Sequence, residues 1–470
     1  MRDIINSITD PLHYAGIEQL SQALRHRQLS ATELTRHMLD RIHELDGTIG
    51  SHICVLEEEA LNAAAETDRR LAAGEDAGRL GGIPVAVKDI FDISGQATTA
   101  GMAVHIDNIA SEDATVIARL RQSGAVITGK TVLTEGVYAE HSPPFRAPLN
   151  PWNNERWSGA SSSGSAVAVA SGLCVAALSS ETGGSIRLPS AANGLTGIKP
   201  TWGRVSRHGT FELAASLDHA GVIARSVNDC AAVLQQIAGA DPGDVTASRL
   251  SVPDYMAAVP QNLRGLRIGL DMDLIGSLAD DEIVSILMSA LDVLVAAGAE
   301  IRSVRLPDVQ QMNEDWFDVC AVQTAYSHRA TWPQHREHYG PALAALIERG
   351  SRLSGMEYQA CILRRKQFRG ELNALFENVD MFALPVMPFT APPLSRMAQV
   401  DEELIAALHT FTCPFNMSGN PSLIMPAGFS HDSLPVVFQL IAPDFHEHAL
   451  FEAGRVFQQK TDWHTRRALK

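Results

Sequence analysis

Hydrophobic residues recur with a helical period through the first part of the chain. Residues 16 to 75 follow this pattern, and Leu34 and Ile42 lie on one face of the predicted helix. The segment Ser30-Ala31-Thr32-Glu33 precedes that face and is a capping-box pattern, which predicts where the helix begins. A second, alanine-rich helix is expected over 60–73. The region is therefore predicted to be helical throughout.

From residue 83 the period changes, and short apolar runs alternate with helical segments. Ile83 to Val87 follows two glycines and predicts a buried strand, with a helix over 114–120 and a strand over 125–128 after it. A tightly packed helix over 165–171 and a strand over 174–178 repeat the pattern. Strands and helices that alternate in this way indicate an α/β fold with a parallel sheet covered by helices.

The second half of the chain continues the alternation with longer helices. The predicted strands are 266–270, 300–304, 381–384, 422–425 and 436–441, and the predicted helices are 282–297, a long stretch over about 311–376, and 446–459. A chain of 470 residues is long enough for two or three domains. The sequence nevertheless has no fixed-period repeat and no low-complexity linker. We therefore expect one domain over residues 1–470.

Composition and charge exclude several classes of partner. The chain is 45% hydrophobic and 20% charged, which is typical of a globular protein. Its formal net charge of −16 argues against a nucleic-acid or anionic-membrane partner, because those surfaces bind clustered Lys and Arg. The N-terminal residues have no signal-peptide pattern, and no apolar run is long enough to predict a membrane span.

The cysteines indicate a reducing compartment. The chain has 6 of them, and none forms a CxxC pair, so neither a zinc site nor a disulfide framework is predicted. Most lie in apolar runs, as Cys174 does, where a thiol packs as a small hydrophobic group. We therefore expect a cytoplasmic protein.

Two segments rich in serine and glycine contain the candidate chemistry. The first, Ser158 to Ser165, has the composition of a flexible linker, but the apolar stretch directly after it belongs in a core. The second, Thr182 to Ser185, suits a tight turn whose glycines let backbone N–H groups face a ligand. Convergent N–H groups can form an oxyanion hole, in front of which Ser185 could attack a carbonyl.

A serine nucleophile needs a base, and Lys88 is the candidate. It ends the apolar run over 83–87, where burial would lower the pKa of its amine and let it accept a proton. Such a lysine can equally reach water or pair with Asp89, and the local sequence leaves both alternatives open. The histidines lie mostly in polar surroundings, such as 335–338, and form no HExxH motif, so no metal site is expected.

These segments together resemble the amidase signature family. The resemblance rests on GGIPVAVKD at Lys88, SGASSSGSAVAVASG at Ser161 and ETGGSIRLPSAANGLTGIKPT at Ser185, within about residues 80–235. It continues more weakly through NMSGNP at 416–421. The resemblance implies the amidase-signature fold, a large mixed and twisted β-sheet covered by helices on both faces.

The resemblance also implies a Ser–Ser–Lys triad. Ser185 matches the nucleophile, Ser161 matches a bridging serine that follows a cis peptide bond in the family, and Lys88 matches the general base. In the implied mechanism a proton passes from Ser185 through Ser161 to Lys88, and the resulting acyl-enzyme is hydrolysed by water. This mechanism needs no metal or cofactor.

Further site residues follow from the same resemblance. Ser162 matches a residue that supports the proton network, and Arg187 matches a structural anchor. The implied oxyanion hole consists of the backbone N–H groups of Thr182, Gly183, Gly184 and Ser185. The implied substrate pocket includes Gly136, Val137, Tyr138, Gly159 and Ala160, with the helical region over about 311–376 as a further wall.

Four positions depart from the family pattern. Ala160 and Ser163 stand where glycine is usual, which makes the serine-rich loop bulkier. Glu181 replaces the usual aspartate before the glycine turn and is one methylene longer. Gly136 replaces an aromatic residue near the pocket, which predicts a reshaped or roomier acyl site.

The sequence predicts an amidohydrolase that cleaves the C–N bond of a small carboxamide. Aryl and alkyl amides are the expected substrates, with carbamates and ureas as further candidates, and the enzyme is expected to be a monomer or homodimer. One alternative is the glutaminase (A) subunit of a tRNA-dependent amidotransferase, which shares the signature but needs partner subunits. The segments 316–339 and 462–464 look more like independent amidases. A GxSxG hydrolase elbow is disfavoured because Ala160 lies two residues before Ser162.

Overall fold

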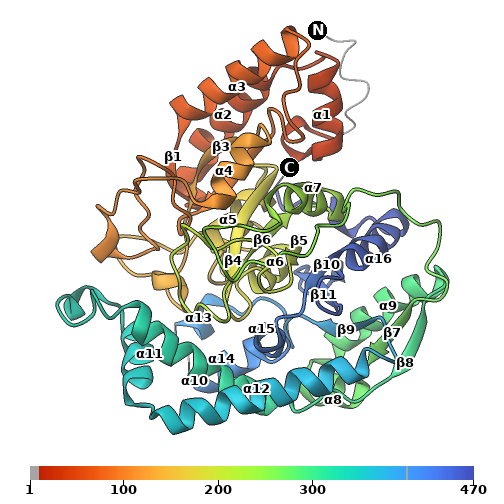
Figure 1. The fold of residues 1–470 in the computed structure, drawn as a ribbon. Helices are drawn as coiled ribbons and strands as arrows, with labels where there is room; N and C mark the ends of the chain where they lie inside the picture. Colours follow the sequence, from red (N-terminus) through yellow and green to blue (C-terminus); the bar gives the residue numbers. More distant parts are fainter. Residues whose placement is uncertain (1–9, 399–400, 470) are drawn as a thin grey trace.

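A computed structural model describes residues 10–398 and 401–469, and its centre is a single large β-sheet (Figure 1). The strands are β1 (His52–Val55), β2 (Pro84–Lys88), β3 (Val126–Thr131), β4 (Ala176–Glu181), β5 (Thr196–Lys199), β6 (His219–Ala224), β7 (Arg267–Leu270), β8 (Glu300–Ser303), β9 (Met381–Pro385), β10 (Ser422–Phe429) and β11 (Pro435–Ile441). Across the 11-stranded sheet their order is β1-β3-β2-β4-β6-β5-β10-β11-β9-β7-β8.

The sheet is mixed. β2 is parallel to both β3 and β4, and β7 is parallel to β8 and β9. The strands from β4 through β6, β5, β10 and β11 to β9 pair antiparallel, as β1 does with β3. Because β2 and β4 are adjacent and parallel, their carboxyl ends lie at the same edge of the sheet, where α/β proteins place ligands.

Sixteen helices surround the sheet in the described part of the chain. They are α1 (Ile17–Arg25), α2 (Ala31–Ile49), α3 (Glu57–Ala72), α4 (Thr115–Gln122), α5 (Ser163–Ala170), α6 (Arg187–Asn193), α7 (Val227–Ile237), α8 (Met272–Leu278), α9 (Asp281–Ala296), α10 (Val309–Ser327), α11 (Pro341–Arg352), α12 (Gly355–Leu375), α13 (Leu394–Met397), α14 (Glu402–His409), α15 (Cys413–Ser418) and α16 (Glu447–Lys460).

Helices cover both faces of the sheet, because successive side chains of a strand point to opposite sides. Ala176 and Leu178 of β4 join a large core that includes α7, α9 and α16. Ala177, between them, joins a separate cluster with α2 and α5. This confirms the predicted α/β class, with a large mixed sheet between two helical layers.

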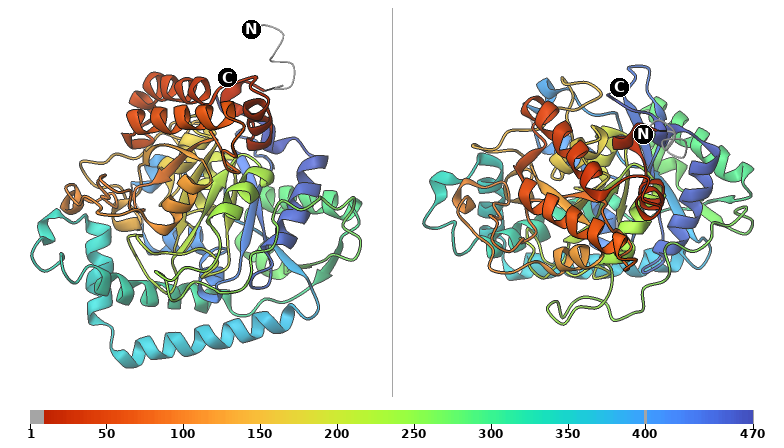
Figure 2. Two further views of the ribbon diagram at one scale, coloured as in Figure 1. Left: turned by 45° about the horizontal axis from the view of Figure 1, so that its top comes forward. Right: turned by 90° about the horizontal axis from the view of Figure 1, so that it is seen from above.

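The helices at the two ends of the molecule come from different parts of the sequence (Figures 1 and 2). α1 to α3, drawn in red, lie at one end, and α10 to α12, drawn in teal and cyan, run along the opposite end. α10 packs against α11, α12 and α15. No helix in the described residues is both long and apolar enough to cross a membrane.

Most predicted elements are present, and the differences have local causes. The capping box is confirmed, since Glu33 N donates to Ser30 Oγ (3.0 Å) and Ser30 N donates to the Glu33 carboxylate (2.9 Å). The prediction of a helical region over 16–75 is wrong at β1, a short strand whose apolar residues also fit a helical face. The stretch over 311–376 is three helices rather than one.

The antiparallel strands β5 and β6 were not predicted. β5 is short, and both strands contain glycine, at Gly197 and Gly221, which weakens a strand pattern in the sequence. A Cβ on Gly221 would lie 2.3 Å from the backbone oxygen of Ile198 in the neighbouring strand. The glycine is therefore required by close approach of two strands, a constraint that only the paired structure contains.

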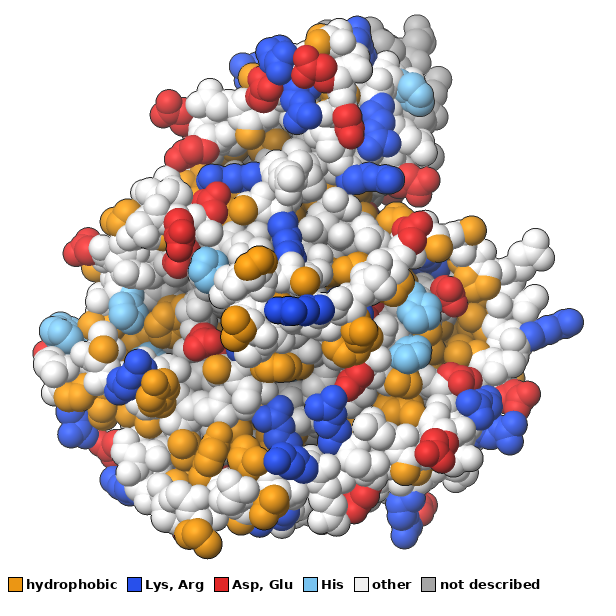
Figure 3. Space-filling view, viewed as in Figure 1, with side chains coloured by type: hydrophobic (Ala, Val, Ile, Leu, Met, Phe, Trp, Pro, Cys, Tyr) orange, Lys and Arg blue, Asp and Glu red, His pale blue; other side chains and the backbone are white. Residues whose placement is uncertain are grey.

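On the face in Figure 3, acidic and basic side chains are interspersed, with apolar groups between them. This face therefore presents no continuous basic surface of the kind that nucleic acids bind.

A buried ion pair ties the ends of β2 and β3 together. Lys130 Nζ lies 2.6 Å from Asp89 Oδ1, and both side chains are 1% exposed. Lys130 Nζ also donates to Ala97 O (2.5 Å) and Thr98 Oγ1 (3.0 Å). Asp89 Oδ2 accepts a hydrogen bond from Thr99 N (3.0 Å). The pair therefore holds the 97–99 loop against the end of β2.

Replacing Lys130 by Met should lower the free energy of unfolding by about 3–5 kcal/mol, because it leaves the Asp89 carboxylate buried without its cation. Urea unfolding followed by circular dichroism measures the change. The double variant Asp89→Asn/Lys130→Met, which removes both charges, should recover part of the loss. A loss below about 1 kcal/mol in Lys130→Met would contradict a buried, charged pair.

Candidate active site

Lys88 lies at the carboxyl end of β2 and contacts three serine hydroxyls. Its side chain is fully buried. Nζ lies 2.6 Å from Ser161 Oγ, 3.0 Å from Ser162 Oγ and 3.0 Å from Ser180 Oγ. Ser162 Oγ donates its own hydrogen to the backbone oxygen of Ser180 (3.1 Å), so it accepts one from Nζ. Three hydroxyl contacts fit either an ammonium with three N–H donors or a neutral amine with two N–H donors and a lone pair.

The surroundings of Lys88 favour the neutral amine. Burial lowers the pKa of Lys88 to about 7, although the charges of Asp218 and Glu181 act in the opposite direction. The neighbouring Asp89 is not its partner, because Asp89 pairs with Lys130. Of the alternatives that the sequence left open, neither an approach to water nor a pair with Asp89 is present.

The two serine-rich segments meet beside Lys88. The peptide bond between Ala160 and Ser161 is cis, the arrangement that the family resemblance implies. Ser162 N donates to the backbone oxygen of Ser185 (3.3 Å), which joins the first segment to the second. The structure therefore brings Lys88, Ser161 and Ser185 to one edge of the sheet, where Ser185 is partly exposed.

A buried ion pair holds the glycine turn between β4 and α6. Glu181, at the end of β4, accepts hydrogen bonds from Ile186 N (3.0 Å) and Arg187 N (3.1 Å). Arg187 Nε donates to Glu181 Oε1 (2.8 Å), and both side chains are 0% exposed. Burial by itself would raise the pKa of Glu181, but Arg187 brings that pKa below its usual value. The pair is therefore charged.

Arg187 connects this turn to two other parts of the fold. Its guanidinium donates to Gln439 Oε1 in β11 (3.0 Å), to Thr412 O (2.7 Å) and to Asn416 Oδ1 in α15 (2.5 Å). The longer side chain of Glu181, which departs from the family pattern, reaches both the backbone of the turn and this guanidinium. Arg187 thus lies where a structural anchor is expected.

The turn itself needs glycine because aromatic and polar groups pack directly on it. A Cβ on Gly183 would lie 2.4 Å from Trp316 Cζ2, and one on Gly184 would lie 2.9 Å from Thr412 Oγ1. Trp316 Nε1 donates to Thr182 O (2.9 Å), and Thr412 Oγ1 donates to Gly183 O (2.6 Å). These carbonyls are bound from outside the turn.

Unlike the carbonyls of the turn, three of its N–H groups have no hydrogen-bond partner among the described residues. Within the described part of the chain, no acceptor is hydrogen-bonded to the N–H groups of Gly183, Gly184 or Ser185. Thr182 is held separately, through its Oγ1 to Asp218 (2.6 Å). Free N–H donors beside a partly exposed serine can bind an oxyanion.

A pocket of about 480 Å³ opens in front of Ser185. Its walls are mostly apolar and aromatic, and it is lined by Val137, Tyr138, Ala139, Glu140, His141, Pro143, Phe145, Arg146, Ala147, Trp157, Ala160, Thr182, Gly183, Ser185, Leu188, Leu213, Trp316, Leu394, Met397, Ile405, Leu408 and His409. Its size is within the usual range for a small-molecule site.

Three of the five predicted pocket residues, Val137, Tyr138 and Ala160, line this pocket, whereas Gly136 and Gly159 do not. The expectation of a roomier site at Gly136 is wrong. Gly136 has φ +54°, and a Cβ there would lie 2.6 Å from Leu343 Cδ2 of α11, so the space is already filled. A Cβ on Gly159 would lie 2.3 Å from Pro189 Cα, which places that glycine against α6.

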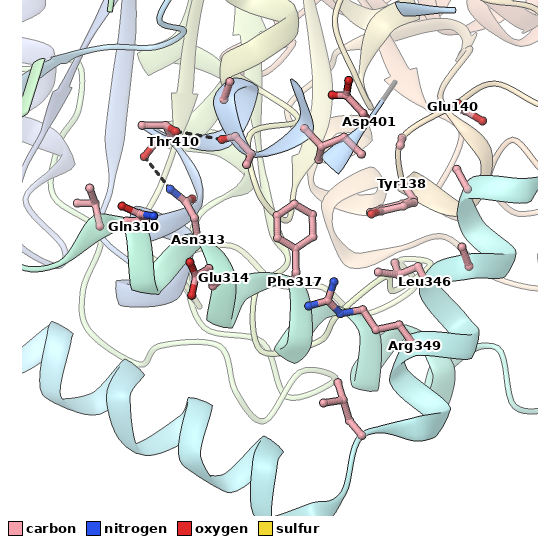
Figure 4. A pocket seen from close by; sticks show the side chains of 18 of the residues that line it. Tyr138, Glu140, Gln310, Asn313, Glu314, Phe317, Leu346, Arg349, Asp401 and Thr410 are labelled. Atoms are coloured by element: carbon pink, nitrogen blue, oxygen red, sulfur yellow. Dashed lines mark hydrogen bonds between the residues drawn. The ribbon is translucent and has the colours of Figure 1, made fainter. Parts of the chain in front are cut away.

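A larger groove of about 1530 Å³ adjoins the pocket between α10, α11 and α14 (Figure 4). Tyr138, Glu140 and Ile405 line both, so the two cavities share one wall. Figure 4 shows Phe317 of α10 in the middle of the groove, with the guanidinium of Arg349 of α11 next to it.

Several site residues could not be predicted from the sequence. Ser180, Trp316, His409 and Thr412 carry no motif, and three of them come from segments far along the chain from the serine clusters. Of these four, only Trp316 lies in the helical region over about 311–376, which the sequence predicted to be a wall of the pocket. His141 bonds Ser163 Oγ (2.9 Å), a serine that the sequence had marked as unusual.

Comparison with known proteins agrees with this geometry. The Amidase family model matches residues 33–451. The chain is 41% identical over 460 residues to "Putative amidase AmiD" of Mycobacterium tuberculosis (strain ATCC 25618 / H37Rv), covering 97% of this chain and 96% of that one. It is 37% identical over 484 residues to the A subunit of the glutamyl-tRNA(Gln) amidotransferase of Pseudomonas fluorescens (strain Pf0-1), covering 97% and 99%.

A solved structure has the same fold. The crystal structure of a bacterial aryl acylamidase of the amidase signature enzymes superposes with a TM-score of 0.87 at 25% identity, covering 97% of this chain and 98% of that one. Taken with the match over residues 33–451, this similarity shows that the chain belongs to the Amidase (amidase signature) family and is an amidohydrolase.

Proposed function

We propose that the chain hydrolyses a small carboxamide with an apolar acyl or aryl group, by a Ser185–Ser161–Lys88 triad. The observation that supports this most strongly is the fully buried Lys88, whose amine lies 2.6 Å from Ser161 Oγ and has a pKa lowered to about 7 by burial. A lysine in this state can act as a base at neutral pH, which a solvated lysine cannot.

The proposed reaction begins with proton transfer along the triad. Lys88 donates hydrogen bonds to Ser162 and Ser180, and its lone pair accepts the hydroxyl proton of Ser161. Ser161 in turn takes the proton of Ser185, whose oxygen attacks the amide carbonyl. The proton then returns through Ser161 to the leaving nitrogen as the C–N bond breaks. Water repeats the sequence on the acyl-enzyme.

The oxyanion of the tetrahedral intermediate is proposed to bind the glycine turn. The N–H groups of Gly183, Gly184 and Ser185 have no acceptor in the described residues, and Thr182 completes the predicted set. The buried pair of Glu181 and Arg187 keeps the turn in place before charge develops, so little reorganisation is needed when it does.

The pocket supports an apolar substrate. Its lining residues include Trp157, Leu188, Trp316 and Leu408. Among the described residues that line it, Glu140 is the only acidic residue and Arg146 is the only lysine or arginine. Apolar walls favour an aryl or alkyl amide, because a charged group would lose hydration there. The similar aryl acylamidase has the same fold, which agrees with this class. Carbamates and ureas share the carbonyl geometry and belong to the same proposal.

A second candidate is the glutaminase role in a tRNA-dependent amidotransferase, which the 37% identity to the A subunit of such an enzyme favours. In that role the chain would release ammonia from glutamine and work with partner subunits. The mostly apolar lining argues against it, since the ammonium and carboxylate of glutamine would have only Glu140 and Arg146 as oppositely charged partners among the lining residues.

Ser185→Ala should abolish hydrolysis and leave the fold intact, because the change removes one hydroxyl oxygen and no core contact. Turnover of 4-nitroacetanilide and the thermal unfolding midpoint measure the two effects. Activity close to that of the unmodified enzyme would show that Ser185 is not the nucleophile.

The pH dependence of kcat/KM should show an acid limb with a midpoint near 7, the pKa to which burial lowers Lys88. Below that pH the amine is protonated and cannot accept a proton, so kcat/KM falls as the pH falls. Above that pH the amine is neutral and kcat/KM reaches a plateau. Lys88→Ala should reduce kcat/KM by about 10²–10⁴-fold.

Lys199 offers a matched control for this pH profile. Burial also lowers its pKa to about 7, but its Nζ donates only to backbone oxygens within the described residues, those of Asn420 (2.5 Å) and Pro200 (3.2 Å). The folded fraction of the Lys199→Met variant should therefore keep the acid limb of the pH profile. An acid limb that persists in Lys88→Ala would assign the titration to another group.

A substrate panel separates the two candidate functions. Anilides and alkyl amides should exceed glutamine by about tenfold or more in kcat/KM, because the apolar pocket penalises the charges of glutamine. Glutamine hydrolysis that exceeds anilide hydrolysis, or that occurs only with the other components of an amidotransferase, would instead favour the glutaminase role.

A further inference from the structure

His409, at the end of α14, lies beside the nucleophile turn. Its ring stacks on Trp316 with 5.4 Å between centroids and 19° between planes. Its backbone oxygen accepts a hydrogen bond from Thr412 N (2.9 Å), and Thr412 Oγ1 binds Gly183 O (2.6 Å). The imidazole is therefore fixed to the same turn that presents Ser185.

The hydrogen bonds of His409 determine which ring nitrogen carries the proton. Nδ1 lies 2.7 Å from the backbone oxygen of Ile405. A carbonyl oxygen only accepts, so Nδ1 must hold the hydrogen. Burial also lowers the pKa of His409 below 6.5, so the ring is neutral at neutral pH. Nε2 is then an unprotonated acceptor.

This acceptor has no donor from the described residues. His409 lines the pocket with Thr182, Gly183 and Ser185, and its side chain is partly exposed there. Among the residues that the structure describes, no donor is hydrogen-bonded to Nε2. His141 lines the same pocket, but its Nε2 is already bonded to Ser163 Oγ (2.9 Å). The pocket thus contains a free histidine acceptor held at the nucleophile turn.

We propose that Nε2 of His409 accepts the N–H of the amide that is cleaved. This inference rests on the proposed function and assigns His409 a part in substrate selection. This hydrogen bond would make the enzyme prefer amides that keep a hydrogen on the leaving nitrogen over esters of the same shape.

The chemistry of amide cleavage explains why such an acceptor is useful. When Ser185 attacks, the nitrogen becomes pyramidal, and its lone pair must point toward the proton that returns through Ser161. An acceptor on the N–H holds the nitrogen in that orientation. The C–N bond breaks as the lone pair takes the proton, and His409 neither gains nor loses a proton in the step. An ester oxygen has no hydrogen for Nε2 to accept.

The test compares an amide and an ester with the same acyl and aryl groups, 4-nitroacetanilide and 4-nitrophenyl acetate. For both, kcat/KM reports the acylation step, and the ratio of the two values does not depend on how much of a variant is folded. His409→Asn places an amide N–H where Nδ1 bonds Ile405 O but removes the Nε2 acceptor. His409→Gln places an amide oxygen near the position of Nε2.

The amide-to-ester ratio should fall by about five- to tenfold in His409→Asn, the effect of one hydrogen bond, and should recover in His409→Gln. His141→Asn is the matched histidine control and should leave the ratio within about twofold of the unmodified enzyme. An unchanged ratio in His409→Asn, or a fall in His141→Asn instead, would overturn the assignment. If Ser185→Ala retained amide hydrolysis, the proposed function would fail, independently of these ratios.

Discussion

The buried pair of Glu181 and Arg187 is the interaction on which the active site depends. Two opposite charges with no exposure to water are costly to bury and are stable only when every donor and acceptor is used. Here the carboxylate takes two backbone N–H groups and the guanidinium, and the guanidinium also binds β11 and α15. The pair joins the end of β4, the glycine turn and the C-terminal part of the sheet, so loss of either partner would affect all three.

The same edge of the sheet gives Lys88, the proposed base, its buried surroundings. β2 and β4 are adjacent and parallel, so Lys88 and the start of the glycine turn lie side by side. α5 begins directly after Ser161 and Ser162 and packs on β2 and β4, and the Lys88 side chain is fully buried. The nearby carboxylate of Asp89 does not restore the charged state of Lys88, because Lys130 neutralises it. Burial, hydrogen bonding and charge pairing therefore act together on one amine.

The pocket includes elements that take no part in the proposed proton relay. The proposed relay comes from β2, the serine-rich loop and the glycine turn, all within the first half of the chain. Residues 137–147 supply a large part of the pocket lining, and Trp316 of α10, Met397 of α13 and His409 of α14 add walls from the second half. A change in α10, α13 or α14 can therefore reshape the pocket without altering Lys88 or Ser185.

By itself the sequence determined the α/β class, most helices and strands, and the motifs around Lys88, Ser161 and Ser185, because hydrophobic period, capping residues and a long signature are local properties. It did not determine β1, β5 and β6, whose short or glycine-containing segments become strands only when paired. The contacts of Lys88, the filling of the space at Gly136 by Leu343, and the position of His409 were decided by the tertiary structure. Each depends on distant segments that pack together, and the distance between such segments is absent from a local pattern.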